Sequence, residues 1–217
     1  MYFQLERVTQ PDIEVIELDE MRRHLRLFED VRDDDADVQD LITAAREWAE
    51  HCTGRVLIEQ QWKLTLSSGV VDAGVSGGDA VSGVYAGSAS ITGSEVFLRR
   101  SPVLGIVSVN LVGTDGTETL LGPESYALRG GGSKYPSLVM LNGGYLTFGT
   151  VVIVMRCGFA DRLGSPMQGA EMVPKRFKQA MKLWASGHYD ADVTAMPALV
   201  QAAEALIMPE RALVPIA

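Results

Sequence analysis

The sequence of 217 residues lacks the features that mark several broad classes of protein. Its two cysteines, Cys52 and Cys157, are too few for a disulfide framework, and free thiols fit a reducing compartment. It has no apolar run of the length that a membrane-spanning helix needs. The first residues, MYFQLERVTQPD, carry acidic groups where a signal peptide has basic and then apolar ones, so we expect no secretory route. A composition of 47% hydrophobic and 22% charged residues favours a globular protein instead.

Positive charge is also scarce. The formal net charge is −9. Residues 1–50 hold 15 Asp and Glu against 6 Arg and no Lys, so this segment accounts for the whole net charge and the other residues balance. Because Lys and Arg neutralise phosphates in nucleic-acid complexes, this distribution argues against broad attraction to DNA or RNA.

Motifs for metal, cofactor and catalytic sites are missing. His24, His51 and His188 have no metal-ligand partner at helical spacing, and no CxxC, HxxxH or HExxH occurs. GGGSK at 130–134 lacks the GxxxxGK[ST] pattern of a phosphate-binding loop, and no GxSxG is present. We therefore predict no metal site, no cofactor and no catalytic residues, and we expect that the protein is not an enzyme.

Three groups of residues invite a functional interpretation, but a structural one is favoured for each. His51 and Cys52 are adjacent, yet helix neighbours point about 100° apart, so Cys52 is interpreted as a structural thiol. The acidic residues 33–37 lack the glycine and closing glutamate of a calcium loop and are interpreted as a solvated turn. The three tryptophans each lie on an apolar face and are interpreted as core anchors (Trp48, Trp62 and Trp184).

Apolar residues at helical spacing predict four helices. After an extended arm over residues 1–17, a helix over 18–28 has an apolar inner face and three arginines outside (Leu18, Met21, Leu25 and Phe28; Arg22, Arg23 and Arg26). The second, over residues 38–52, ends at Gly54, which suits the left-handed position after a helix. The third begins near Pro174 and has four larger residues on one side (Phe177, Met181, Trp184 and His188). The last runs from about Pro197 to Pro209 and is expected to bury its larger apolar residues (Leu199, Val200, Ala203, Leu206 and Ile207).

The middle of the chain has the two-residue period of strands. Strands are expected at 60–67, 95–99, 106–112, 117–121, 126–129, 137–141 and 150–157, with a hairpin turn at Asp115-Gly116. Residues 150–157 are apolar on both faces, which predicts a central strand. Residues 67–94 hold 7 Gly, 7 Ser and no Lys or Arg, which is typical of a mobile flap or a long hairpin.

This order predicts an α+β fold, in which a small helical bundle frame carries an inserted antiparallel β-sandwich or barrel-like module. Residues 1–59 supply the N-terminal arm and helices, and residues 161–217 supply the C-terminal helices and tail. These two segments are expected to pack as one helical domain. Residues 60–160 form the β module, with the flap at 67–94.

The same order carries a resemblance to a known family. The motifs are Leu18-x-Glu20-x-x-x-His24-Leu25-Arg26, Asp35-x-x-Val38-x-x-Leu41-Ile42-x-Ala44-Ala45-Arg46-x-Trp48-x-Glu50-x-x-Thr53-Gly54-Arg55, Gln61-Trp62-x-Leu64, Leu98-x-x-Ser101-Pro102-Val103, Val152-x-Val154-x-x-x-Gly158-Phe159 and Val173-Pro174-x-x-Phe177-x-Gln179-Ala180. With them the chain resembles the head–tail connector (adaptor, or neck) proteins of long-tailed phages and gene transfer agents, in the subgroup with an inserted β module.

This resemblance implies a structural protein of the virion, assembled in the host cytoplasm, without membrane contact. Its partners would be copies of itself in a ring, usually of twelve, the portal protein above, and the next neck, stopper or tail protein below. The ring would extend the DNA channel, so that DNA passes transiently and without sequence specificity. A ring needs unlike surfaces that close by rotation, and an extended arm and an apolar tail offer such surfaces.

Three expectations about particular segments follow. The apolar tail has no evident partner in the chain and would anchor in the portal (Leu213, Val214 and Ile216). The acidic residues Asp33, Asp34 and Asp35 would face the channel, so that passing DNA is not held. The flap at 67–94 would become ordered against a neighbouring copy.

Two other functions stay open on the sequence alone. One is a small-ligand-binding or hydrolytic enzyme whose site lies between the β module and the helices. The other is a host-encoded binding module that holds a peptide or a sugar on its β part.

Overall fold

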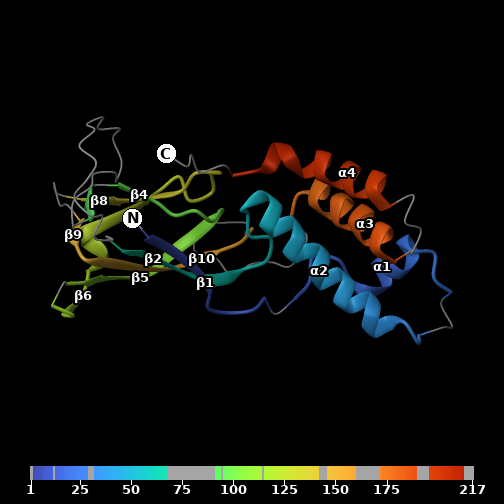
Figure 1. Cartoon of the computed structure of the whole chain (residues 1–217), viewed down its shortest axis with the longest axis horizontal. Coiled ribbons are helices and arrows are strands. Elements are labelled where there is room, and N and C mark those ends of the chain that lie inside the picture. The colour runs from blue at the N-terminus through green and yellow to red at the C-terminus, as the bar shows by residue number, and fades with distance from the viewer. Residues whose placement is uncertain are drawn as a thin grey trace. The chain divides into compact units, whose positions relative to one another are not determined.

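The computed structural model describes residues 2–11, 13–28, 32–67, 91–93, 95–113, 115–141, 146–159, 172–189 and 196–212. The chain divides into a β unit, residues 1–10 and 60–157, and a helical unit, residues 11–59 and 158–217 (Figure 1). The mixed α+β fold predicted from the sequence is confirmed. Residues 1–10 belong to the β unit, whereas the sequence grouped them with the helices. Most of the expected flap, residues 68–90 and 94, lies outside the described residues.

The largest sheet of the β unit has five antiparallel strands in the order β1-β2-β10-β5-β6. The strands are β1 (Tyr2–Arg7), β2 (Gln60–Ser67), β10 (Thr150–Cys157), β5 (Val103–Val112) and β6 (Glu118–Leu120). The predicted central position of residues 150–157 is confirmed, because β10 lies between β2 and β5.

One face of this sheet is apolar. Leu64 pairs with Ile153 of β10 and with Leu5 of β1, so these three residues point to the same side. Leu64 and Ile153 are fully buried. This pairing explains why the N-terminal arm forms β1: Phe3 and Leu5 alternate in step with the apolar residues of β2.

Two smaller sheets complete the β unit among the described residues. One has the order β4-β8-β7 (Glu95–Phe97, Ser137–Met140 and Tyr126–Arg129), and the other pairs β3 (Ile91–Gly93) with β9 (Leu146–Phe148). Both are antiparallel. The predicted strand at 117–121 is shortened to β6, whose three residues are exposed. The strand orders within the described residues form no closed barrel, because β1 and β6 remain separate edges of the large sheet.

The helical unit contains α1 (Leu18–His24), α2 (Asp35–Thr53), α3 (Lys175–Tyr189) and α4 (Met196–Ile207), followed by the 3₁₀ turn Met208–Glu210. α2 buries residues at i, i+4 and i+7 spacing, which pack against Phe177 and Met181 of α3 in one core (Val38, Ile42, Ala45 and Ala49). Gly54 ends α2 with φ +68°, as predicted. The rings of Trp48 and Trp184 stack at 5.8 Å between α2 and α3, at the edge of this core.

The ends of the helical unit differ from the sequence prediction in two places. The first helix ends at His24, four residues short of Phe28, whose side chain is 81% exposed rather than part of an apolar stripe. In α4, only Ala203 and Ile207 are buried, although five residues were expected to be. Among the described residues, no helix is both long and apolar enough to cross a membrane.

Candidate interaction surfaces

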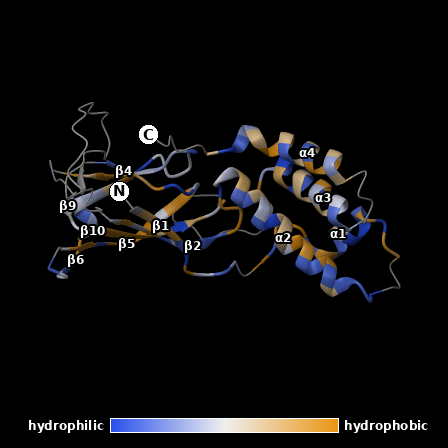
Figure 2. Cartoon of the chain, viewed as in Figure 1, coloured by the Kyte–Doolittle hydropathy of each residue, from blue (hydrophilic) through white to orange (hydrophobic). Residues whose placement is uncertain are grey.

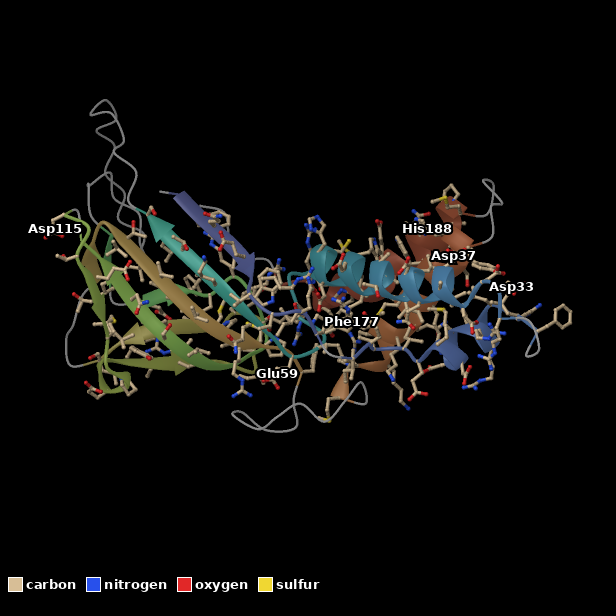
Figure 3. All side chains as sticks on the ribbon, turned by 90° about the horizontal axis from the view of Figure 1, so that it is seen from below. Asp33, Asp37, Glu59, Asp115, Phe177 and His188 are labelled. Carbon is tan, nitrogen blue, oxygen red and sulfur yellow. The ribbon has the colours of Figure 1, made fainter. Side chains whose placement is uncertain are left out.

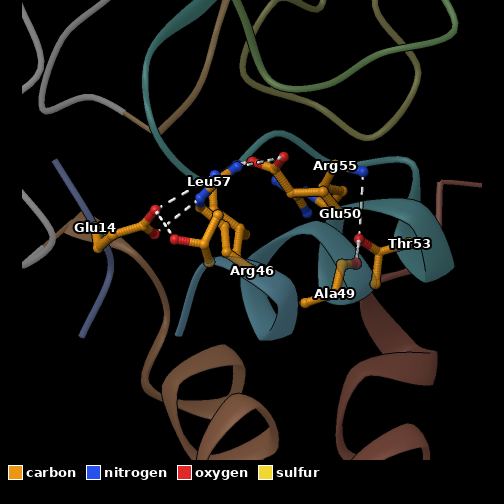
Figure 4. A network of polar contacts seen from close by, with 8 residues as sticks. Glu14, Arg46, Ala49, Glu50, Thr53, Arg55 and Leu57 are labelled. Carbon is orange, nitrogen blue, oxygen red and sulfur yellow. Dashed lines mark hydrogen bonds and ion pairs between the residues drawn. The ribbon is translucent and has the colours of Figure 1, made fainter. Parts of the chain in front are cut away.

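Arg46 of α2 holds the N-terminal part of the helical unit to the helix. Its side chain is only 2% exposed. Its Nε donates to Glu14 Oε2 at 2.9 Å, and its Nη1 lies 3.3 Å from Glu50 Oε2, one turn further along α2 (Figure 4). Glu50 Oε1 in turn accepts a hydrogen bond from the backbone N–H of Leu57 at 2.8 Å. The network therefore ties three segments together: the arm before α1, α2, and the chain that leaves α2.

Arg22 fixes the connector between α1 and α2. It was expected on the outside of the first helix, but its side chain is 4% exposed, so that prediction was wrong. It forms an ion pair with Asp35 at the start of α2, and its Nη2 donates to the carbonyl oxygen of Phe28 at 2.6 Å. The periodicity of α1 could not reveal a partner that lies 13 residues away. The Phe28 ring projects from a backbone held by a buried cation.

Arg55 fixes residues 208–212, here called the C-terminal segment. Its Nη1 lies 2.7 Å from Glu210 Oε2, and Arg176 Nη1 lies 2.9 Å from Glu210 Oε1. The backbone N–H of Ala212 donates to the carbonyl of Thr53 at 2.7 Å. Burial lowers the pKa of Arg55, and the Glu210 carboxylate opposes this shift. The C-terminal segment is therefore bound along the end of α2.

The three residues proposed as the portal anchor lie outside the described residues (Leu213, Val214 and Ile216). The chain leaves the described part of the structure at Ala212, directly after the contacts to Arg55 and Thr53.

The three predicted channel residues differ in their surroundings. Asp35 is paired with Arg22 and Arg32, and Asp34 Oδ2 accepts a hydrogen bond from the hydroxyl of Tyr189 at 2.9 Å. Asp33 is exposed, as is Asp37, and both lie at the N-terminal end of α2 (Figure 3). Two of the three aspartates thus have structural partners in the chain, and the exposed charge at this end of α2 comes from Asp33, Asp34 and Asp37.

Charge is unequally divided between the units. The β unit contains seven acidic and seven basic residues, so the net charge of −9 belongs to the helical unit. Within the helical unit, α3 has four basic residues and no acidic one (Lys175, Arg176, Lys178 and Lys182), whereas α1 contains residues of both signs.

No chemical centre was found in the described part of the chain. It contains no group of three or more His, Cys, Asp or Glu residues that could hold a metal ion. Burial, and then the nearby Glu204 carboxylate, raise the pKa of the Cys52 thiol, which disfavours the reactive thiolate. His51, next to it, is exposed.

No family model matches the chain, and no curated protein matches it. Solved structures do match along almost the whole length. A chain in the neck of an empty gene transfer agent particle, computed with C6 symmetry, superposes with a TM-score of 0.69 at 24% identity, covering 98% of this chain and 97% of that chain. A chain in the virion of a native gene transfer agent particle gives 0.69 at 23% identity with the same coverage. A chain in the neck of a native particle, computed with C12 symmetry, gives 0.65 at 22% identity.

These matches define the class of fold: both the helical unit and the β unit are present in chains from gene transfer agent particles, in one continuous chain of similar length.

Proposed function

We propose that this chain is a structural neck protein of a phage-like particle, and more narrowly the adaptor that forms a ring, of twelve copies, beneath the portal. The observation that carries the proposal is the agreement of fold over 98% of this chain and 97% of a neck chain. Two of the similar chains come from necks computed with C6 and C12 symmetry, and a ring of repeated copies is the assembly such symmetry describes. The helical unit supports this role through the segments that its buried arginines fix in place.

In this role the protein extends the DNA channel, docks the next neck, stopper or tail protein, and catalyses nothing. It works in the particle after assembly in the host cytoplasm. Repeated weak contacts around a ring gain strength through effective concentration, so no single contact needs high affinity.

The test is to mix the purified protein with the portal from the same genomic neighbourhood at micromolar concentration and to image the mixture by negative-stain electron microscopy. Rings stacked coaxially on the portal are expected, and their symmetry gives the copy number. Single copies beside bare portals would contradict assembly on the isolated portal. A repeat with DNA-filled capsids distinguishes a need for the filled capsid from a wrong assignment.

We further propose that the apolar tail anchors the ring in the portal. Deleting residues 213–217 removes the tail and leaves the Arg55–Glu210 pair and the Ala212–Thr53 hydrogen bond in place. The deletion is expected to weaken portal binding while the helical unit stays folded by circular dichroism. Unchanged binding would rule the anchor out.

The acidic start of α2 is proposed to face the channel, so that DNA slides without being held. Asp33→Lys with Asp37→Lys reverses charge at two exposed sites without breaking the ion pair of Asp35. This variant should bind DNA more tightly or slow its passage. Glu118→Lys with Glu124→Lys, at exposed sites of the β unit, is the matched control. Equal DNA affinity of both variants would contradict the proposal.

Within the expected flap at 67–94, residues 68–90, which lie outside the described residues, are proposed to become ordered against a neighbouring copy. Limited proteolysis should then cut this segment in the free protein and spare it in the ring. Equal cleavage in both states would argue against it.

A further inference from the structure

The helical unit has two unlike apolar surfaces on different sides. α1 packs on α2 and is joined to α3 by the Lys182–Glu20 ion pair, whereas α4 packs mainly on α3 and in part on α2. Phe28 projects from the chain that follows α1. The second surface is α4 itself.

Phe28 combines a fixed backbone with an exposure that is unusually high for a large apolar side chain. Its ring is 81% exposed, more than any other exposed large hydrophobic residue of the described chain. Its carbonyl oxygen nevertheless accepts a hydrogen bond at 2.6 Å from Arg22, which is itself buried and paired with Asp35. Because the backbone is already fixed, placing this ring in a partner costs little ordering entropy.

α4 is more apolar than its burial explains. Its sequence, MPALVQAAEALI, has only two polar side chains, Gln201 and Glu204. Figure 2 shows the ribbon of α4 mostly in apolar colours. Most of its apolar residues are exposed or half-buried, and Met208, just after it, is 57% exposed. A helix at a surface ordinarily turns polar residues to solvent, whereas the exposed face of α4 has small apolar residues beside Gln201 and Glu204. Leu206 packs in part on the core of the helical unit and Leu199 lies beside Gly187 of α3, so Val200 and Met208 are the larger apolar residues left for a partner.

The charges beside these two surfaces are opposite. Asp33 and Asp37 are exposed near Phe28, at the start of α2. Arg211 and Lys175 are both exposed. They lie near Met208, because the ion pair between Arg176 and Glu210 joins the start of α3 to the chain that follows α4. A second copy of this chain can therefore supply both an apolar ring for α4 and carboxylates for these cations. Two unlike surfaces on one subunit are what a head-to-tail ring requires.

We propose that Phe28 of one copy packs on the exposed face of α4 in the next copy, near Met208, with Asp33 and Asp37 facing Arg211 and Lys175. This inference rests on the proposed ring and names the contact that closes it. The occupant of α4 is a second copy of the same chain.

The test is photo-crosslinking with Phe28→p-benzoylphenylalanine in the full-length protein, with unlabelled and ¹⁵N-labelled copies mixed at about 100 μM. Mass spectrometry is expected to find residue 28 of one copy joined to residues 196–212 of another. Crosslinks to other segments, crosslinks within one copy only, or none would overturn the inference. Leu120→p-benzoylphenylalanine, at an exposed apolar site of β6, is the control and should not label residues 196–212.

Sedimentation velocity of the same samples separates this inference from the proposed function. Rings without the crosslink from residue 28 to α4 would overturn the interface and leave the neck assignment standing. The absence of any self-association, alone or on the portal, would count against both.

A second measurement uses variants that stay folded, because the altered side chains are exposed. Phe28→Ser should raise the dissociation constant for self-association about tenfold or more, as expected for an aromatic residue at the centre of an interface. Leu120→Ser should not change it. Asp33→Arg and Arg211→Asp should each weaken association, and the pair together should recover it. Failure of both Phe28→Ser and the charge pair to change association would refute the contact.

Discussion

Removing the Arg46 guanidinium should destabilise the helical unit severely. The side chain is 2% exposed and bridges Glu14 with Glu50, which is itself 7% exposed. Arg46→Met keeps most of the volume but removes the Arg46 cation that faces the carboxylates of Glu14 and Glu50. Breaking a buried ion pair from one side costs about 3–5 kcal/mol. With a urea m-value of about 1.5 kcal/mol/M, this loss lowers the unfolding midpoint by about 2–3 M.

Far-UV circular dichroism at 222 nm is the suitable assay, since every α-helix of the described chain lies in the helical unit. Arg23→Met, at an exposed arginine of α1, is the matched control and should change stability by less than about 0.5 kcal/mol. The double variant Arg46→Met with Glu50→Gln should lose less than Arg46→Met alone, because it no longer buries the Glu50 charge in the absence of the Arg46 cation. A loss under about 1 kcal/mol for Arg46→Met, or a double variant less stable than the single one, would refute the claim that the buried Arg46 cation stabilises the helical unit.

Three other predictions concern single residues. Gly158→Ala should destabilise the protein by at least about 2 kcal/mol in urea unfolding. The cause is that Gly158 has φ +141° and that a Cβ there would lie 2.7 Å from the Glu59 backbone. Gly105→Ala is the control and should not destabilise the protein in this way, because the space around Gly105 is open. Burial, and then a nearby lysine, lower the pKa of His24 from 6.5 in the folded protein. The unfolded chain therefore takes up this proton first, and the free energy of unfolding should fall as the pH drops below about 6.5. If the free energy of unfolding of His24→Gln falls as much as that of the unmodified protein over this range, the assignment is contradicted. Cys52 should react with iodoacetamide at pH 7.5 at least about tenfold more slowly in the folded than in the urea-unfolded protein, since burial raises the pKa of its thiol; equal rates would contradict it.

The regular elements could be predicted because each depends on residues close together in the sequence. The apolar period of residues 38–52 and the following Gly54 locate α2, and apolar residues on both faces of 150–157 identify the central strand. Strand pairing depends on distant partners, so the sequence indicated an extended arm but not that β1 pairs with β2.

The predictions failed where a charged side chain finds its partner in another element. Arg22 was placed outside by the period of α1, but Asp35 and the Phe28 carbonyl make its burial possible. The chain turns after His24 through Arg26, which has φ +58°, so Phe28 leaves the helical stripe and becomes exposed. The burial of Arg22 depends on a long-range ion pair that no local pattern contains.

Each of the three buried arginines of the helical unit binds a different segment of the chain to the unit. Arg22, Arg46 and Arg55 lie near the start, middle and end of α2 and bind, in turn, the connector that carries Phe28, the arm before α1, and the C-terminal segment. Buried ion pairs are a poor source of stability, since desolvation offsets much of the attraction, and apolar side chains would hold such segments as well. An ion pair differs in requiring one geometry, with fixed donors and acceptors. Two of the segments so fixed, the connector with Phe28 and the C-terminal segment, carry the proposed contacts. A subunit that meets its neighbour with pre-positioned surfaces has less entropy to lose on assembly, which favours a ring built from many weak contacts.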